Sequence, residues 1–123
     1  MTCQRLFFLT SIAALVCPLA QMRAAPSSEN RVAEIQSALR AAKLDGWLFY
    51  DFRGSDPLAL RILKLDQHAV GSRRWFYYIP ATGECTKIVH RIEPAKLDTL
   101  PGTRLEYSSW KELHARLRDT VAA

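Results

Sequence analysis

The chain has 123 residues, of which 49% are hydrophobic and 24% charged, and its formal net charge is +5. This composition excludes a disordered chain, because disordered segments contain too few apolar residues to form a core. The length allows at most one small domain, and the basic residues, apart from the Arg73-Arg74 pair, are interspersed with acidic ones, so we expect no nucleic-acid partner.

Residues 1–25 have the three parts of a secretory signal peptide. Arg5 supplies the positive start, residues 6–20 form the apolar stretch, and small residues such as Ala20 provide an exit. The apolar stretch is shorter than the roughly 20 residues of a transmembrane helix. We therefore expect an exported chain, periplasmic or secreted, with a domain over residues 26–123. An uncleaved N-terminal anchor, which would be the membrane attachment, stays open as an alternative.

Removal of this signal would change the charge and the cysteine chemistry of the chain. The count of Lys and Arg falls from 17 to 15 against 12 Asp and Glu, so the net charge falls from +5 to +3. Two of the three cysteines lie in the signal, which leaves Cys85 alone. A single thiol forms no internal disulfide, so in an oxidising compartment Cys85 is either buried or a site of cross-linking.

The first elements predicted after the signal are a helix and a buried strand. Ser28 or Asn30 caps the helix by accepting a backbone N–H, and Gly46 marks its end. The run WLFY at residues 47–50 is typical of a strand buried on both faces. The helix residues expected to face the core are Val32, Ile35, Leu39 and Ala42.

A charged corner follows this strand and leads into a second, short helix. Asp56 is a favourable cap, and Pro57, which lacks an N–H group, suits the first helical position. Capping does not explain Asp51 or Arg53, for which a salt bridge, a ligand clamp and an interface pair are the open interpretations. The short helix is expected to face the core with Leu58, Ile62 and Leu65.

The second half of the chain predicts three strands and a last helix. The segments RRWFYYIP (73–80) and CTKIVH (85–90) flank a turn and form an antiparallel hairpin, and TRLEYS (103–108) adds a third strand. Ser109 and Glu112 have the spacing of a capping box. The last helix is expected to face the core with Trp110, Leu113, Leu117 and Val121.

The predicted element order is helix, strand, helix, strand, strand, strand, helix. This order predicts an α/β fold with a mixed sheet flanked by helices. Because only residues 26–123 contribute to the domain, its core is small and its stability modest.

The chain offers few side chains for metal binding or nucleophilic catalysis. Cys85 and the histidines show no ligand spacing such as Cys-x-x-Cys, so we predict no metal site and no cofactor in this chain. Cys85 and His90 lie an odd number of residues apart on one predicted strand, which points their side chains to opposite faces. Trp75 and its aromatic neighbours beside Arg73 suggest either a stacking surface for single-stranded nucleic acid or a buried strand, and the buried strand suits an exported protein better.

Five segments, taken in order, resemble one known family. The similarity extends over residues 31–118, with Asp56 where the family favours Asn and Cys85 where it favours Pro. The segments are LDGWLFYDFRGSDPLALRIL (44–63), SRRWFYYIPATGE (72–84), KIVHRIE (87–93), LPG (100–102) and YSSWKEL (107–113). With these segments, the chain resembles the N-terminal domain of the Xaa-Pro aminopeptidase, prolidase and creatinase family of metallopeptidases.

The resemblance implies an α/β N-terminal domain beside a larger catalytic domain. In the family, that second domain carries two Asp, one His and two Glu ligands for two divalent metal ions, which activate the attacking water. None of these ligands falls within this sequence, so the resemblance assigns it no catalytic residue, no metal and no cofactor. It also implies that the domain is incomplete, since relatives continue with a further strand.

In relatives, the N-terminal domain shapes substrate access and helps to build dimers. The expected function is therefore that of a non-catalytic N-terminal domain of an exported Xaa-Pro aminopeptidase-like metallopeptidase, with a homodimer or the catalytic domain as partner. The alternative is a free-standing periplasmic binding or interaction module on the same scaffold. The candidates for a substrate-side or interface role are Asp51, Arg53, Arg73 and Trp75.

Overall fold

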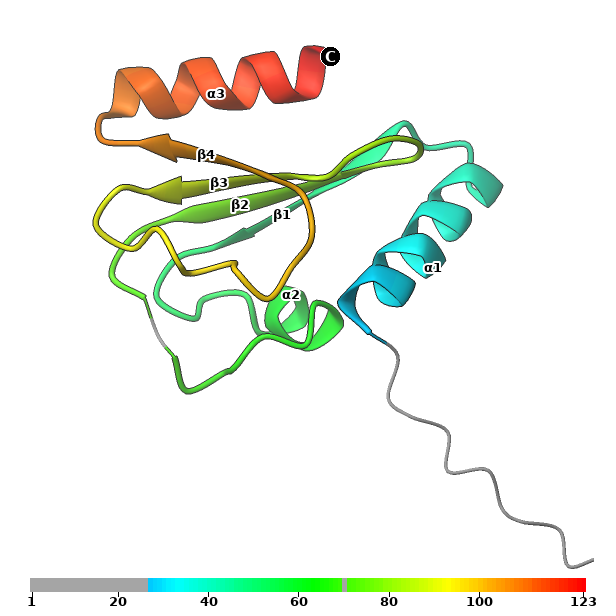
Figure 1. The fold of residues 1–123 in the computed structure, drawn as a ribbon, viewed down its shortest axis with the longest axis horizontal. Coiled ribbons are helices and arrows are strands. Elements are labelled where there is room, and N and C mark those ends of the chain that lie inside the picture. The colour runs from blue at the N-terminus through cyan, green and yellow to red at the C-terminus, as the bar shows by residue number, and fades with distance from the viewer. Residues whose placement is uncertain (1–26, 70) are drawn as a thin grey trace, which may run out of the picture.

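The computed structural model describes residues 27–69 and 71–123 (Figure 1), so the signal predicted for residues 1–25 lies outside the described residues. The elements follow in the predicted order. No helix in the described ranges is long and apolar enough to cross a membrane. The bounds are α1 (Ser28–Ala41), β1 (Gly46–Asp51), α2 (Pro57–Ile62), β2 (Trp75–Pro80), β3 (Thr86–His90), β4 (Thr103–Tyr107) and α3 (Trp110–Ala122).

The strands form a mixed sheet in the order β1-β2-β3-β4. β1 pairs with β2, and β2 with β3, in antiparallel fashion, whereas β4 runs parallel to β3. The parallel pairing arises because residues 91–102 form turns and carry the chain back across the sheet before β4 begins. The predicted α/β class, with a mixed sheet and flanking helices, is confirmed, and so is the antiparallel hairpin.

The helices cover opposite faces of the sheet. α1 packs against β1 and β2, and α2 against β1, while α3 packs on the other face against β3 and β4 (Figure 1). β2 serves both faces because its side chains alternate: Trp75 and Tyr77 join the larger core, and Phe76 packs against the smaller one. Cys85 is buried in the larger core, which is one of the two environments expected for a single thiol.

Helix α1 begins and ends earlier than the sequence suggested. Ser27, and not Ser28 or Asn30, is the N-cap, and its Oγ accepts the N–H of Asn30 at 3.2 Å. The helix ends before Gly46 because Lys43 adopts the left-handed conformation, with φ of 57°. Glycine usually supplies this helix ending, so a rule that looks for glycine places the end too late.

Strand β1 is less buried than its apolar sequence predicts. Trp47 is 50% exposed and Leu48 is also exposed, whereas Phe49 is buried. β1 has a neighbouring strand on one side only within the described sheet, and the helices cover only part of its surface. The prediction of a strand buried on both faces is therefore wrong.

The core-facing positions of α2 and α3 were also predicted only in part. Leu113 is buried as expected, but Trp110 is 60% exposed and Val121 is exposed. In α2, Leu58 was expected to face the core but is exposed, while its neighbour Ala59 is buried. Both helices touch the sheet along a narrow stripe, because each contacts one or two strands.

Candidate functional site

A pocket of about 340 Å³ lies at one end of the sheet, where strand termini meet. The pairing directions bring the carboxyl ends of β1, β3 and β4 and the amino end of β2 to this end of the sheet. Loops at strand ends are free to carry function, since they need not pair in the sheet. The lining residues are Phe52, Arg53, Ser72, Arg73, Arg74, His90, Tyr107, Ser108, Ser109, Trp110 and Leu113.

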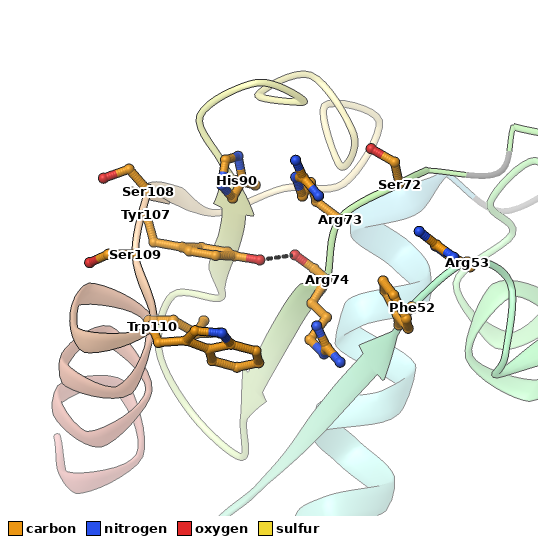
Figure 2. A pocket seen from close by; sticks show the side chains of 11 residues that line it. Phe52, Arg53, Ser72, Arg73, Arg74, His90, Tyr107, Ser108, Ser109 and Trp110 are labelled. Atoms are coloured by element: carbon orange, nitrogen blue, oxygen red, sulfur yellow. Dashed lines mark hydrogen bonds between the residues drawn. The ribbon is translucent and has the colours of Figure 1, made fainter.

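The Arg74 guanidinium lies between two aromatic rings of the pocket wall. Its central carbon is 4.2 Å from the centroid of the Phe52 ring and 4.9 Å from that of Trp110 (Figure 2). Arg53 contacts Phe52 as well, at 5.0 Å. Stacking uses the flat faces of a guanidinium and leaves the N–H groups at its edge available for an acceptor. The rings therefore orient Arg74 without neutralising it.

The pocket arginines have no carboxylate partner in the described part of the chain. The only salt bridges there join Arg104 to Asp98 and to Glu106, away from the pocket. Arg53, Arg73 and Arg74 thus bring three positive charges to one hollow. Such a group attracts anions more strongly than scattered surface charges do, because the low-dielectric wall focuses its field.

Tyr107 and His90 fix the wall formed by the ends of β3 and β4. The Tyr107 hydroxyl donates to the backbone oxygen of Arg74 at 2.7 Å (Figure 2), and burial raises the pKa of this hydroxyl despite the nearby arginines. The His90 ring packs edge-on against Tyr107, and its Nδ1 accepts the N–H of Ile92 at 3.2 Å. These contacts tie β4 to the segment that enters β2.

Two glutamates brace the backbone around the pocket. Glu93 accepts hydrogen bonds from the N–H and the hydroxyl of Ser72, at 2.7 and 2.6 Å, and from the N–H of Arg73 at 3.3 Å. The predicted capping box of α3 forms in altered shape: Ser109 Oγ accepts the N–H of Glu112, but the Glu112 carboxylate binds Ser108 instead of Ser109. Both carboxylates therefore hold the loops in place.

Glu93 makes the stability of the domain depend on acid pH. Burial alone would raise the pKa of Glu93, but the hydrogen bonds from Ser72 and Arg73 and the charge of Lys96 together lower it below its ordinary value of 4.5. A carboxyl group with a lowered pKa in the folded state stabilises the fold above its unfolded pKa and loses that effect as the pH falls through the folded value.

We therefore expect Glu93→Gln to be less stable than the parent chain at neutral pH, with the difference shrinking as the pH falls below 4.5. Thermal unfolding measured across this acid range checks the result. Glu34→Gln, at an exposed position of α1, is the matched control. Its thermal stability should change with pH in the same way as that of the parent chain. A pH-independent difference for Glu93→Gln would contradict the stated cause.

The four predicted candidates fall into two groups in space. Arg53 and Arg73 line the pocket, where Arg74 joins them. Asp51 lies beneath the corner, 2% exposed, and its carboxylate accepts the N–H groups of Gly54 and Asp56 at 3.0 and 2.9 Å. Trp75 is buried in the larger core. The structure thus brings two of the four into one site.

Sequence reasoning missed several residues of the pocket. Trp110 was assigned to the core, Phe52 and Tyr107 were not considered as site residues, and His90 was weighed only as a metal ligand or a partner of Cys85. The available signal was their position: each lies within two residues of the end of a predicted strand, or begins the last helix. Aromatic and basic residues gathered at such ends indicate a candidate site, because the ends of neighbouring strands meet.

The groups with nucleophilic or metal-binding chemistry lie apart from one another. Within residues 27–69 and 71–123, no three His, Cys, Asp or Glu side chains form a cluster suited to a metal ion. Burial raises the pKa of the Cys85 thiol, and the thiol lies in the core, away from the pocket lining. The pocket itself presents guanidinium, imidazole and hydroxyl groups, a set suited to binding anions.

The chain was also compared with known proteins. No protein-family model matches this chain, and no curated protein matches it. The family resemblance therefore stays a hypothesis that depends on the quoted segments.

Proposed function

We propose that the domain over residues 26–123 is a non-catalytic N-terminal domain of an exported Xaa-Pro aminopeptidase-like metallopeptidase, acting through binding and shaping of a substrate entrance. One observation carries this proposal. All eleven lining residues of the pocket come from four of the five segments on which the resemblance depends, namely 44–63, 72–84, 87–93 and 107–113. Segments far apart in the chain, all of them part of the resemblance, thus meet at one site.

The first test is enzymatic. We expect the purified full chain to release no N-terminal residue from Xaa-Pro peptides, with or without added manganese, because the resemblance places the metal ligands in another domain. Amino-acid release is followed by mass spectrometry, with an authentic Xaa-Pro aminopeptidase as positive control. Metal-dependent turnover by this chain would contradict a purely binding role.

A second test concerns the family itself. The transcript is sequenced beyond the codon for Ala123 and translated in all frames. A segment with two Asp, one His and two Glu in the family order supports the peptidase assignment. A transcript without that segment counts against it.

The second candidate function is a free-standing periplasmic or secreted binding module. The observation in its favour is the set of three arginines that have no carboxylate partner among residues 27–69 and 71–123, which suits a ligand independently of any catalytic domain. This function requires a domain that folds on its own. A thermal scan with one cooperative transition supports it, and a scan without any transition contradicts it.

A further inference from the structure

We propose that the pocket at the strand ends binds a small phosphorylated molecule, attracted by the positive charges of Arg53, Arg73 and Arg74 in its lining. The inference goes beyond the proposed function and applies to either of its two forms, since it concerns the ligand class of the pocket alone. It starts from charge. Three guanidinium groups line the hollow, and none is within salt-bridge distance of a carboxylate in the described residues.

The number of free donors favours phosphate over a single carboxylate. A carboxylate fills the donor edges of one or two guanidinium groups, whereas a phosphate monoester offers three oxygens and nearly two negative charges. The Ser109 Oγ acts as the acceptor for Glu112, and its side chain points away from the arginines (Figure 2), so the guanidinium groups are the donors that matter here. The hydroxyls of Ser72 and Ser108 are already used, since each donates to a glutamate.

Helix α3 adds to the same preference. Ser109 caps this 13-residue helix at the rim of the pocket. The N–H groups of Trp110 and Lys111, the first two of the helix, have no acceptor within the described ranges. Free N–H groups and the positive end of a helix dipole favour phosphate at this rim of the pocket.

Within the described residues, the two glutamates at the rim form no ion pair with the pocket arginines. Glu93 and Glu112 are held by serine and backbone donors, and neither lies within 4.0 Å of an arginine side-chain nitrogen in the pocket. The volume of about 340 Å³ exceeds what a phosphate group needs and leaves room for an organic body. The exposed part of the Trp110 ring offers that body apolar contact.

The test uses the full chain labelled with nitrogen-15 and titrated with phenyl phosphate and with inorganic phosphate. We expect the indole N–H signal of Trp110 to shift with saturation, assigned through the loss of that signal in Trp110→Phe. Binding should be stronger at about pH 7.5 than at about pH 5, because a phosphate monoester has its second pKa near 6. Benzoate, which has the same ring and a single carboxylate, is the comparison ligand.

Two variants and one control assign the contact. Arg73→Gln and Arg74→Gln should each raise the dissociation constant of phenyl phosphate by at least about tenfold, since each removes a charge-assisted contact. Arg118→Gln removes the same charge from an exposed position of α3 outside the pocket and should leave binding within about twofold. Arg73 is exposed, so its replacement leaves the core intact.

Three results would overturn the proposal. They are an absence of saturable shifts with either phosphate, equal binding of benzoate and phenyl phosphate, and equal weakening by Arg118→Gln and Arg73→Gln. The first means that the pocket takes no phosphate, the second that it is a general carboxylate site, and the third that the attraction is merely overall charge. None of these results bears on peptidase turnover, so the proposed function is judged separately.

Discussion

Replacing Gly102 with alanine is expected to destabilise the domain by at least about 3 kcal/mol, the combined effect of backbone strain and overpacking. Gly102 has a φ of 117°, a conformation that L residues rarely adopt. A Cβ built there would lie 2.3 Å from the carbonyl oxygen of Cys85. That oxygen also accepts the N–H of Thr103 at 3.0 Å, at the start of the β3–β4 pair, so it cannot move away without loss of pairing. Urea unfolding of the parent chain and of Gly102→Ala measures the difference in their free energies of unfolding.

Gly83→Ala is the matched control for this experiment. Gly83 also has a positive φ, of 98°, but a Cβ built there meets no atom within 4 Å. Alanine at this position introduces the backbone strain of a positive φ but no steric clash, and should lower the stability by about 1 kcal/mol. Similar losses of stability for the two variants would mean that the contact with Cys85 has no energetic effect.

Replacing Asp51 with alanine is expected to cost about 2–4 kcal/mol, because two backbone N–H groups lose a charged acceptor beneath the surface. These groups belong to Gly54 and Asp56 and shape the corner between β1 and α2. Asp51→Asn keeps one acceptor oxygen and should fall between the parent chain and Asp51→Ala. Equilibrium unfolding in urea again gives the free energies.

Asp56→Ala separates this effect from ordinary helix capping. Asp56 Oδ1 accepts the N–H groups of Leu58 and Ala59 at 3.1 and 3.0 Å, and the loss of such a cap costs about 1 kcal/mol. A loss for Asp51→Ala no larger than that for Asp56→Ala would contradict the view that the buried carboxylate organises the corner. The two variants together show how much each aspartate of the segment DFRGSDP contributes to the stability of the corner.

The order of elements was predictable because each has a local signature. The alternation of β2, the Asp56-Pro57 start of α2 and the serine cap of α3 are all set by neighbours in sequence. Burial was less predictable, as Trp47 and Trp110 demonstrate. An apolar residue is buried only where another element covers it, and the sequence does not state which strand lies at the edge.

The candidate site was predictable only where charge marked it. Arg53 was selected because capping did not explain it, Arg73 because it stands beside an aromatic run, and both line the pocket. The orientation of Arg74 depends on Phe52 and Trp110, which meet only after the strands have paired and the chain has crossed from β3 to β4. Trp75 was misleading because it begins β2 on the face that joins the larger core. Contacts between distant segments leave no pattern in the local sequence from which they could be predicted.

The exposed edge strand β1 has a consequence for the protein in concentrated solution. Its sequence, GWLFYD, is rich in residues that favour extended structure and carries a single charge. Within the described sheet, the outer row of its backbone N–H and C=O groups faces no strand. Such an edge is a template on which a second extended chain assembles, and neither lysine nor proline guards it. Aggregation of the protein should therefore begin with the pairing of β1 and an extended segment of a second chain.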